Sequence, residues 1–220
     1  MQFSEFSKSL NTKLKKIDIT LDEGQQKKLF SFMQLLKQWN EKMNLTAIIE
    51  ENEIVLKHFV DSLTVFKYVK NQDKVLDIGT GAGFPGIPLK IAKKEIQITL
   101  VDSLRKRTTF LQEAVKELEL KDVEIIHARA EELKKAEEYK EKYDIVVSRA
   151  VANFNLLSEY MLPFVKQGGI AVAMKGANIQ EELESSENTI QKLGGKIEKI
   201  ETFELPESNY KRNIIIISKK

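Results

Sequence analysis

Cysteine is absent from this chain of 220 residues, and histidine occurs only twice. Without cysteine the protein has no disulfides, no thiolate zinc ligands and no thiol nucleophile. Two histidines leave little with which to build a metal site, so we expect none. These absences exclude disulfide-stapled folds, zinc-finger-like modules and thiol-dependent catalysis.

Long apolar runs and a strong net charge are missing as well. No run approaches the ~20 apolar residues that cross a bilayer, and the opening segment MQFSEFSKSLNTKLKK has no apolar stretch typical of a signal peptide. We therefore expect a cytoplasmic protein that does not bind membranes. The net charge is only +2, so any contact with nucleic acid must come from a local basic surface.

Glycine, by contrast, is concentrated in one stretch. Gly79, Gly81, Gly83 and Gly86 all lie in KVLDIGTGAGFPGIPLKI, although the whole chain has only ten glycines. An apolar run precedes them and a helical pattern follows, so the stretch predicts a strand, a glycine turn and a helix. That arrangement can hold a small ligand at a helix N-terminus.

Two cofactors compete for this predicted loop. Gly81–Gly86 fits G-x-G-x-x-G, the dinucleotide fingerprint, which is a weak signal alone. Asp77 extends it to D-x-G-x-G-x-G, and an acid there would repel a pyrophosphate. The acid suits a ligand with an ammonium group, such as S-adenosylmethionine. An α/β turn that binds nothing is the remaining alternative, and the density of glycine argues against it.

The periodicity of apolar residues divides the chain in two. Residues 1–70 show helical spacing and predict an N-terminal helical extension. Residues 71–220 alternate between strand and helix and predict a Rossmann-like core, with helices over 131–142, 153–165 and 178–193 and a turn at Gly168 and Gly169. Two final runs, near 196–205 and 213–218, predict an antiparallel hairpin that closes a parallel sheet.

Two charged residues stand at the carboxyl ends of predicted strands, where open α/β sheets bind ligands. Asp102 ends the second strand and can bind the hydroxyls of an adenosine ribose; a helix N-cap is the alternative. Given the glycine loop, we favour the ribose. Arg149 ends the fourth strand and can meet a carboxylate or phosphate. A structural salt bridge is the alternative for Arg149.

Three polar residues share one face of a predicted helix in the extension: His58, Asp61 and Ser62. This face could be the polar edge of an active-site cleft. The spacing alone favours a hydrogen-bonded helix surface, because such triplets are common.

Basic residues form a further group of candidates. Arg105, Lys106 and Arg107 fall in the first turn of a predicted helix, where they oppose the helix dipole. A bound anion or RNA phosphate would offset that, whereas a solvated cluster is the alternative. With Lys175 and Arg212, they are our candidates for contacts with RNA.

Several segments together carry a much more specific signal than the glycine loop: WNEKMNLTAI, KHFVDSL, VLDIGTGAGFPGIPLKI, DSLRKR, HARAEEL, VVSRAV and MKG. With them the chain resembles the bacterial glucose-inhibited division protein B family, the small-subunit ribosomal RNA guanine-N7 methyltransferases. The order of elements is similar to the class I S-adenosylmethionine methyltransferases, whose seven-stranded sheet ends in an antiparallel hairpin.

This resemblance implies S-adenosylmethionine as cofactor, S-adenosylhomocysteine as product, and one guanine of 16S ribosomal RNA in an assembled or assembling small subunit as substrate. We expect a monomer. The resemblance assigns cofactor binding to Gly79, Phe84, Ala130, Glu131 and Arg149.

The superfamily's acidic positions correspond to Asp77 and Asp102, and the loop adds Gly81. No catalytic residue is assigned; Arg149, Lys175 and His58 are candidates for the cleft.

The chemistry of guanine N7 is compatible with so sparse a set of catalytic groups. Its lone pair attacks without loss of a proton, so positioning can supply much of the rate. A cytosine-C5 mechanism is excluded because it needs a cysteine nucleophile. A nicotinamide-dependent oxidoreductase and a noncatalytic RNA-binding module remain as competing classes. The Tyr-x-x-x-Lys pair typical of the first is missing, and the second needs no such glycine loop.

Overall fold

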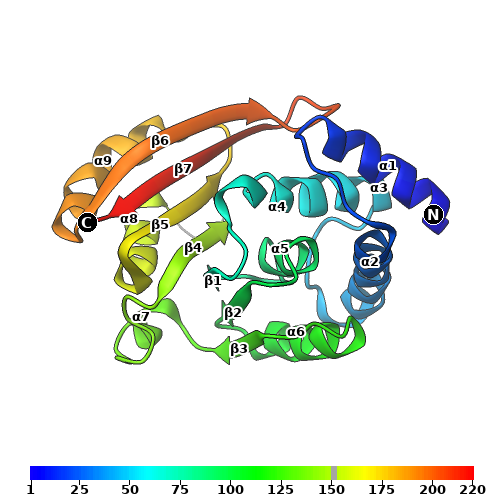
Figure 1. Cartoon of the computed structure of the whole chain (residues 1–220), viewed down its shortest axis with the longest axis horizontal. Helices are drawn as coiled ribbons and strands as arrows, with labels where there is room; N and C mark the ends of the chain where they lie inside the picture. Colours follow the sequence, from blue (N-terminus) through cyan, green and yellow to red (C-terminus); the bar gives the residue numbers. More distant parts are fainter. Residues whose placement is uncertain (150–152) are drawn as a thin grey trace.

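The structure, a computed structural model, describes residues 1–149 and 153–220. Within them a seven-stranded sheet has the order β3-β2-β1-β4-β5-β7-β6 (Figure 1). The strands are β1 (Lys74–Ile78), β2 (Gln97–Asp102), β3 (Val123–His127), β4 (Tyr143–Arg149), β5 (Val165–Lys175), β6 (Gly195–Glu204) and β7 (Lys211–Lys219).

The first five strands pair in parallel, and β7 pairs antiparallel with both β5 and β6. The predicted parallel sheet with a terminal antiparallel hairpin is therefore confirmed. The order reverses between β1 and β4, because β2 and β3 lie to one side of β1 and the later strands to the other. Ligands bind at such a switch point, beyond the carboxyl ends of the strands.

Helices cover both faces of the sheet. The helical segments are α1 (Phe3–Lys15), α2 (Glu23–Met43), α3 (Glu51–Ile54), the π-helix η1 (Val55–Val60), α4 (Asp61–Leu63), η2 (Phe66–Tyr68), α5 (Gly86–Ala92), α6 (Arg105–Glu117), α7 (Ala130–Leu133), α8 (Phe154–Met161), η3 (Leu162–Phe164) and α9 (Gln180–Lys192).

Two hydrophobic cores lie on opposite faces because neighbouring strand residues point in opposite directions. On β4, Ile145 and Val147 face the core that contains α5, α6 and the N-terminal helices. Val146 between them faces the core of α8 and α9. The N-terminal helices thus share one core with the sheet: Phe32 of α2 contacts both Phe84 and Phe110.

Local predictions differ from the structure in three places. The predicted helix over 131–142 is only α7, Ala130–Leu133, followed by turns, since its charged sequence has few apolar residues with which to hold a longer helix on the sheet. The predicted helix over 153–165 ends earlier, as α8 followed by η3. Gly168 and Gly169 lie within β5 rather than in a separate turn, at a shift in its register with β4.

Within residues 1–149 and 153–220, no helix is long and apolar enough to span a membrane. Neither do those residues contain a cluster of histidine, aspartate or glutamate suited to a metal ion.

Candidate functional site

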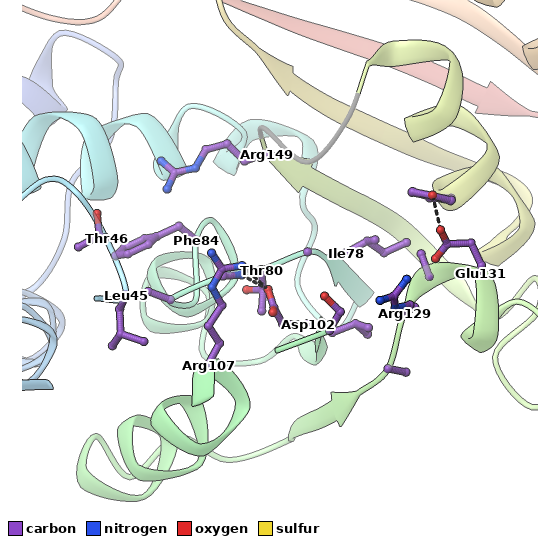
Figure 2. A pocket seen from close by; sticks show the side chains of 18 of the residues that line it. Leu45, Thr46, Ile78, Thr80, Phe84, Asp102, Arg107, Arg129, Glu131 and Arg149 are labelled. Atoms are coloured by element: carbon purple, nitrogen blue, oxygen red, sulfur yellow. Dashed lines mark hydrogen bonds and ion pairs between the residues drawn. The ribbon is translucent and has the colours of Figure 1, made fainter. Parts of the chain in front are cut away.

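A cavity of about 480 Å³ opens beyond the carboxyl ends of β1, β2, β3 and β4 (Figure 2). Its size falls in the range of sites for nucleoside-sized ligands, roughly 300–1,000 Å³. Its walls come from the glycine loop, the ends of the strands, the segment after β3 and the N-terminal extension. They include Leu45, Thr46, His58, Ile78, Gly79, Thr80, Gly81, Ala82, Phe84, Val101, Asp102, Ser103, Arg107, Ala128, Arg129, Ala130, Glu131, Arg149 and Tyr160.

The loop after β1 brings its backbone to the cavity. Gly79 and Gly81 have φ values of 68° and 61°, in the left-handed region that glycine adopts without strain. The amide of Gly79 donates to the carbonyl of Val101 at 2.8 Å, which ties the loop to β2. Among the described residues, nothing lies within 4 Å of where a Cβ on Gly81 would stand. A side chain at Gly81 would therefore project into open space.

Asp77 lies beneath this loop and does not line the cavity. Its Oδ2 accepts hydrogen bonds from the Thr80 hydroxyl at 2.7 Å and from the Gly86 amide at 2.8 Å. Burial raises the pKa of Asp77 to about 7. A Cβ on Gly86 would approach Oδ2 of Asp77 to 2.8 Å and the Leu100 side chain to 2.3 Å, so only glycine fits there. The contacts of Asp77 fix the loop, and a contact with an ammonium group stays a prediction.

Asp102 does line the cavity, and it also holds the backbone around it. Its Oδ2 accepts from the Gly81 amide at 2.9 Å and Arg107 Nη1 at 3.3 Å, and its Oδ1 from the Leu104 amide at 2.9 Å. The residue that caps α6 is Leu104, so the N-cap alternative for Asp102 is wrong. A carboxylate with about four acceptor positions retains capacity for a ribose hydroxyl.

The segment after β3 supplies the opposite wall. Ala128, Ala130 and Glu131 line it together with Tyr160 of α8. The Tyr160 hydroxyl donates to Oε1 of Glu131, and this hydrogen bond lowers the pKa of Glu131. Sequence reasoning missed Tyr160, because helical spacing on α8 shows no link to a residue of α7.

The N-terminal extension forms the third wall. The His58 ring stacks on Phe84, with centroids 4.3 Å apart and 12° between the planes. Its Nε2 lies 3.0 Å from the Thr46 hydroxyl, and its Nδ1 lies 3.2 Å from Arg149 Nη2. Since a guanidinium can only donate, Nδ1 is the acceptor and Nε2 carries the proton. The predicted helix surface is wrong, because His58, Asp61 and Ser62 are all buried. His58 lines the cavity, whereas Asp61 and Ser62 are not among the residues that line it.

Arg149 leaves the end of β4 and extends toward the same helical segment. Its Nη1 donates to the Lys57 carbonyl at 2.8 Å and to Oδ2 of Asp61 at 3.2 Å. The guanidinium also lies 5.2 Å from the centroid of the Phe84 ring. Arg149 therefore forms the structural salt bridge that was the alternative, and it also lines the cavity. Its contact with a carboxylate or phosphate of a ligand stays a prediction.

The other basic candidates do not form one surface. Arg105 and Lys106 are exposed at the start of α6, whereas Arg107 is half-buried and faces the cavity through its contact with Asp102. Lys175 is mostly buried and pairs with Glu182 at 2.7 Å, and it is not among the residues that line the cavity. Arg212 lies within β7, where its Nε donates to Oδ1 of Asp61 at 3.1 Å.

The arrangement fits the adenosyl and methionyl parts of S-adenosylmethionine. The strand-end Asp102 offers acceptors to hydroxyl groups, and Ile78 and Phe84 offer apolar contact. Within the described part of the chain, the buried Nε of Arg107 has no hydrogen-bond partner. That donor and the Arg149 guanidinium are suited to the acceptor atoms of such a ligand.

Comparisons with known proteins identify the family. The family GidB, described as rRNA small subunit methyltransferase G, matches residues 25–215. The chain belongs to this family. A "Ribosomal RNA small subunit methyltransferase G" of Acetivibrio thermocellus is 53% identical over 202 residues, which cover 91% of this chain and 83% of the relative. A protein of the same name from Clostridium botulinum is 44% identical over 217 residues, which cover 98% of this chain and 91% of the relative.

Solved structures support the fold of the GidB chain at low sequence identity. "M. jannaschii TYW2 in complex with AdoMet" superposes with a TM-score of 0.58 and 18% identity, over 74% of this chain and 76% of that one. A precorrin-6y C5,15-methyltransferase of Geobacter metallireducens superposes with a TM-score of 0.54 and 14% sequence identity. The superposition covers 72% of this chain and 86% of that one. The expected class I methyltransferase fold, enzyme class and cofactor S-adenosylmethionine are confirmed.

Burial of His58 makes a testable prediction for this GidB protein. Burial, together with the positive charge of Arg149, lowers the pKa of His58 from 6.5 to about 3. Below pH 6.5, His58 binds a proton in the unfolded chain but stays neutral in the folded chain. The free energy of unfolding therefore falls as pH drops toward 3. We expect the difference in unfolding free energy between wild type and His58→Gln to shrink by about 1–2 kcal/mol from pH 7 to pH 5.

Urea unfolding of both proteins at each pH measures this difference. The buried Asp77 has a raised pKa and acts in the opposite direction, but it is present in both proteins and cancels. His127→Gln, which changes an exposed histidine on β3, is the control and should follow the wild type. A constant difference between wild type and His58→Gln would show that His58 is protonated equally in both states.

Proposed function

We propose that the protein transfers the methyl group of S-adenosylmethionine to N7 of one guanine in small-subunit ribosomal RNA. The observation that carries this proposal is the cavity bounded by the D-x-G-x-G-x-G loop, Asp102 and Arg149 in a chain of the GidB family. A nicotinamide oxidoreductase is disfavoured because buried Asp77 lies directly beneath the loop that would hold a pyrophosphate.

We assign the cofactor site to residues of the loop and the strand ends: Gly79, Gly81, Phe84, Asp102, Ala130, Glu131 and Arg149, with Asp77 supporting the loop from below. The bound cofactor supplies a methyl group already activated by its sulfonium. Guanine N7 would take this methyl group, and the cofactor would leave as the neutral thioether S-adenosylhomocysteine. No proton is removed from N7, so the chain needs no general base at this point.

The protein's own residues then contribute orientation and electrostatics. Asp77 and Asp102 accept hydrogen bonds from loop amides and hold them in fixed positions. Phe84 contacts both the stacked His58 ring and the Arg149 guanidinium. His58 is neutral near pH 7 because burial depresses its pKa. A neutral ring adds no repulsion to a site that accepts a cationic cofactor.

We also propose separate roles for the two segments of the chain. Residues 71–220 form the catalytic core, and the extension of residues 1–70 supplies the wall with Thr46 and His58. Asp61 of the extension lies behind this wall and pairs with Arg149. The enzyme acts as a cytoplasmic monomer on small subunits or their assembly intermediates.

The direct test uses small subunits from cells that lack the corresponding methylation. Incubation with the protein and methyl-tritiated S-adenosylmethionine should place label on one guanine, at N7, as mapped by nuclease digestion and chromatography. Free ribosomal RNA and methylated subunits are incubated in parallel. Label at an exocyclic amine or ribose oxygen, or on protein, would refute the proposed reaction.

We propose that the RNA contacts include some of Arg105, Lys106, Arg107, Lys175 and Arg212. The exposed pair Arg105 and Lys106 offers the simplest test. We expect the double variant Arg105→Ala/Lys106→Ala to bind substrate RNA more weakly and to reduce the slope of log affinity against log salt by about 0.7–0.9 per lost contact. Filter binding over a salt series measures the slope. Lys116→Ala/Lys121→Ala removes the same charge near the other end of α6 and is the control. Equal slopes in both doubles would move the basic surface elsewhere.

A further inference from the structure

One buried carboxylate joins two arginines that come from strands on either side of β5. Asp61 of α4 is only 3% exposed. Its Oδ2 accepts from Nη1 of Arg149 at 3.2 Å, and its Oδ1 accepts from Nε of Arg212 at 3.1 Å. Arg149 ends β4 and Arg212 lies on β7, so the extension bridges two strands that do not pair with each other.

The two guanidinium groups would repel each other without this carboxylate. Burial is the main cause that lowers the pKa of Arg149, and the charge of Arg212 lowers it further, whereas Asp61 acts to raise it. Among the hydrogen-bond partners that the described residues give Arg149, Asp61 alone carries a negative charge, because the others are the Lys57 carbonyl and the His58 ring. Removing a partner from a buried ion pair leaves an uncompensated charge.

The cavity wall is therefore sensitive to the charge of Asp61. Arg107, Arg129 and Arg149 line the cavity together with Asp102 and Glu131. Asp61 lies behind Arg149 rather than on the wall, and it contributes the charge that offsets this excess of cations. The methyl donor carries a positive sulfonium, whereas the product after transfer is a neutral thioether.

We propose that Asp61 is a positioning residue that holds Arg149 and Arg212 together and sets the preference of the cavity for the cationic donor over the neutral product. This inference rests on the proposed function. With the charge of Asp61 present, the cavity accepts the sulfonium. Without it, two unpaired guanidinium groups oppose the sulfonium and leave binding of the thioether less affected.

The test compares two ligands that differ by this one charge. Calorimetry gives the dissociation constants of S-adenosylmethionine and S-adenosylhomocysteine for wild type and Asp61→Asn. We expect the ratio of donor to product dissociation constants to rise about fivefold in Asp61→Asn, the order expected for one unit charge in a partly solvated site. Turnover should then show stronger inhibition by product.

A second variant separates charge from packing. Asp61→Asn/Arg212→Gln removes one negative and one positive charge, and Arg212 does not line the cavity. We expect the double variant to return the ratio to within about twofold of wild type, since the net charge is restored. Glu53→Gln is the control: Glu53 pairs with Lys57 on the same helical segment and makes none of the described contacts to Arg149.

Thermal unfolding of each variant is the check that it is folded. Equal weakening of donor and product in Asp61→Asn, or no recovery in the double variant, would overturn the charge role and leave Asp61 as a packing residue. Failure of the proposed function gives a different result from failure of this inference. If the proposed function were wrong, the wild-type protein itself would bind neither ligand, or it would transfer no methyl group.

Discussion

Replacing Gly79 with aspartate is expected to abolish cofactor binding and leave the fold intact. Gly79 lines the cavity and has a φ of 68°, a region that aspartate tolerates better than most residues. The new side chain would place bulk and a negative charge beside the ligand, above the buried Asp77. We expect the dissociation constant of S-adenosylmethionine to rise at least about 100-fold, equivalent to about 2.7 kcal/mol.

Calorimetric titration and circular dichroism together check this result. Gly168→Asp is a matched control, because Gly168 has a φ of 74° and no described atom within 4 Å of where its Cβ would stand, but it lies on β5 outside the cavity. Both variants carry the same backbone strain and the same added charge. Wild-type affinity in Gly79→Asp would show that the loop does not approach the ligand.

Arg149 is expected to contribute more to the binding of the cofactor than to the binding of RNA. Alanine would remove its ion pair with Asp61, its hydrogen bond to His58 and its contact with Phe84. Lysine would keep the charge but lose the planar fork that bonds several partners at once. We expect Arg149→Ala to weaken the methyl donor by about 10- to 100-fold, or roughly 1.4–2.7 kcal/mol, and Arg149→Lys to weaken it less.

Dissociation constants for both the donor and substrate RNA decide this assignment in each variant. Arg212→Ala is the control, since Arg212 bonds the other oxygen of Asp61 but does not line the cavity. We expect that variant to lose RNA affinity or turnover while donor affinity stays within a few-fold of wild type. If Arg149→Ala lost RNA affinity and kept donor affinity, Arg149 would belong to the substrate site.

The order of residues along the chain was enough to predict the sheet and the loop. Short continuous apolar runs are typical of strands that are buried on both faces, and their alternation with helical patterns along 71–220 predicted the parallel strands and the closing hairpin. The glycines at 79, 81 and 83 permit the positive φ values that the tight turn into α5 adopts. Asp102 and Arg149 were predicted because strand ends meet at one edge of a parallel sheet.

Where the local predictions failed, long-range packing was the reason. The helix α7 stops after Leu133, because the surrounding structure and not the local pattern decides where a short helix ends. The charged run after α7 has helical propensity but too few apolar side chains to dock on the sheet.

The third wall of the cavity depends on tertiary packing that no local pattern contains. Helical spacing placed His58 and Asp61 on one face, but it could not say what lies against that face. Asp61 meets Arg149 across 88 residues and Arg212 across 151. Such pairings depend on how the extension packs into the shared core, and buried polar groups take the partners that this packing supplies.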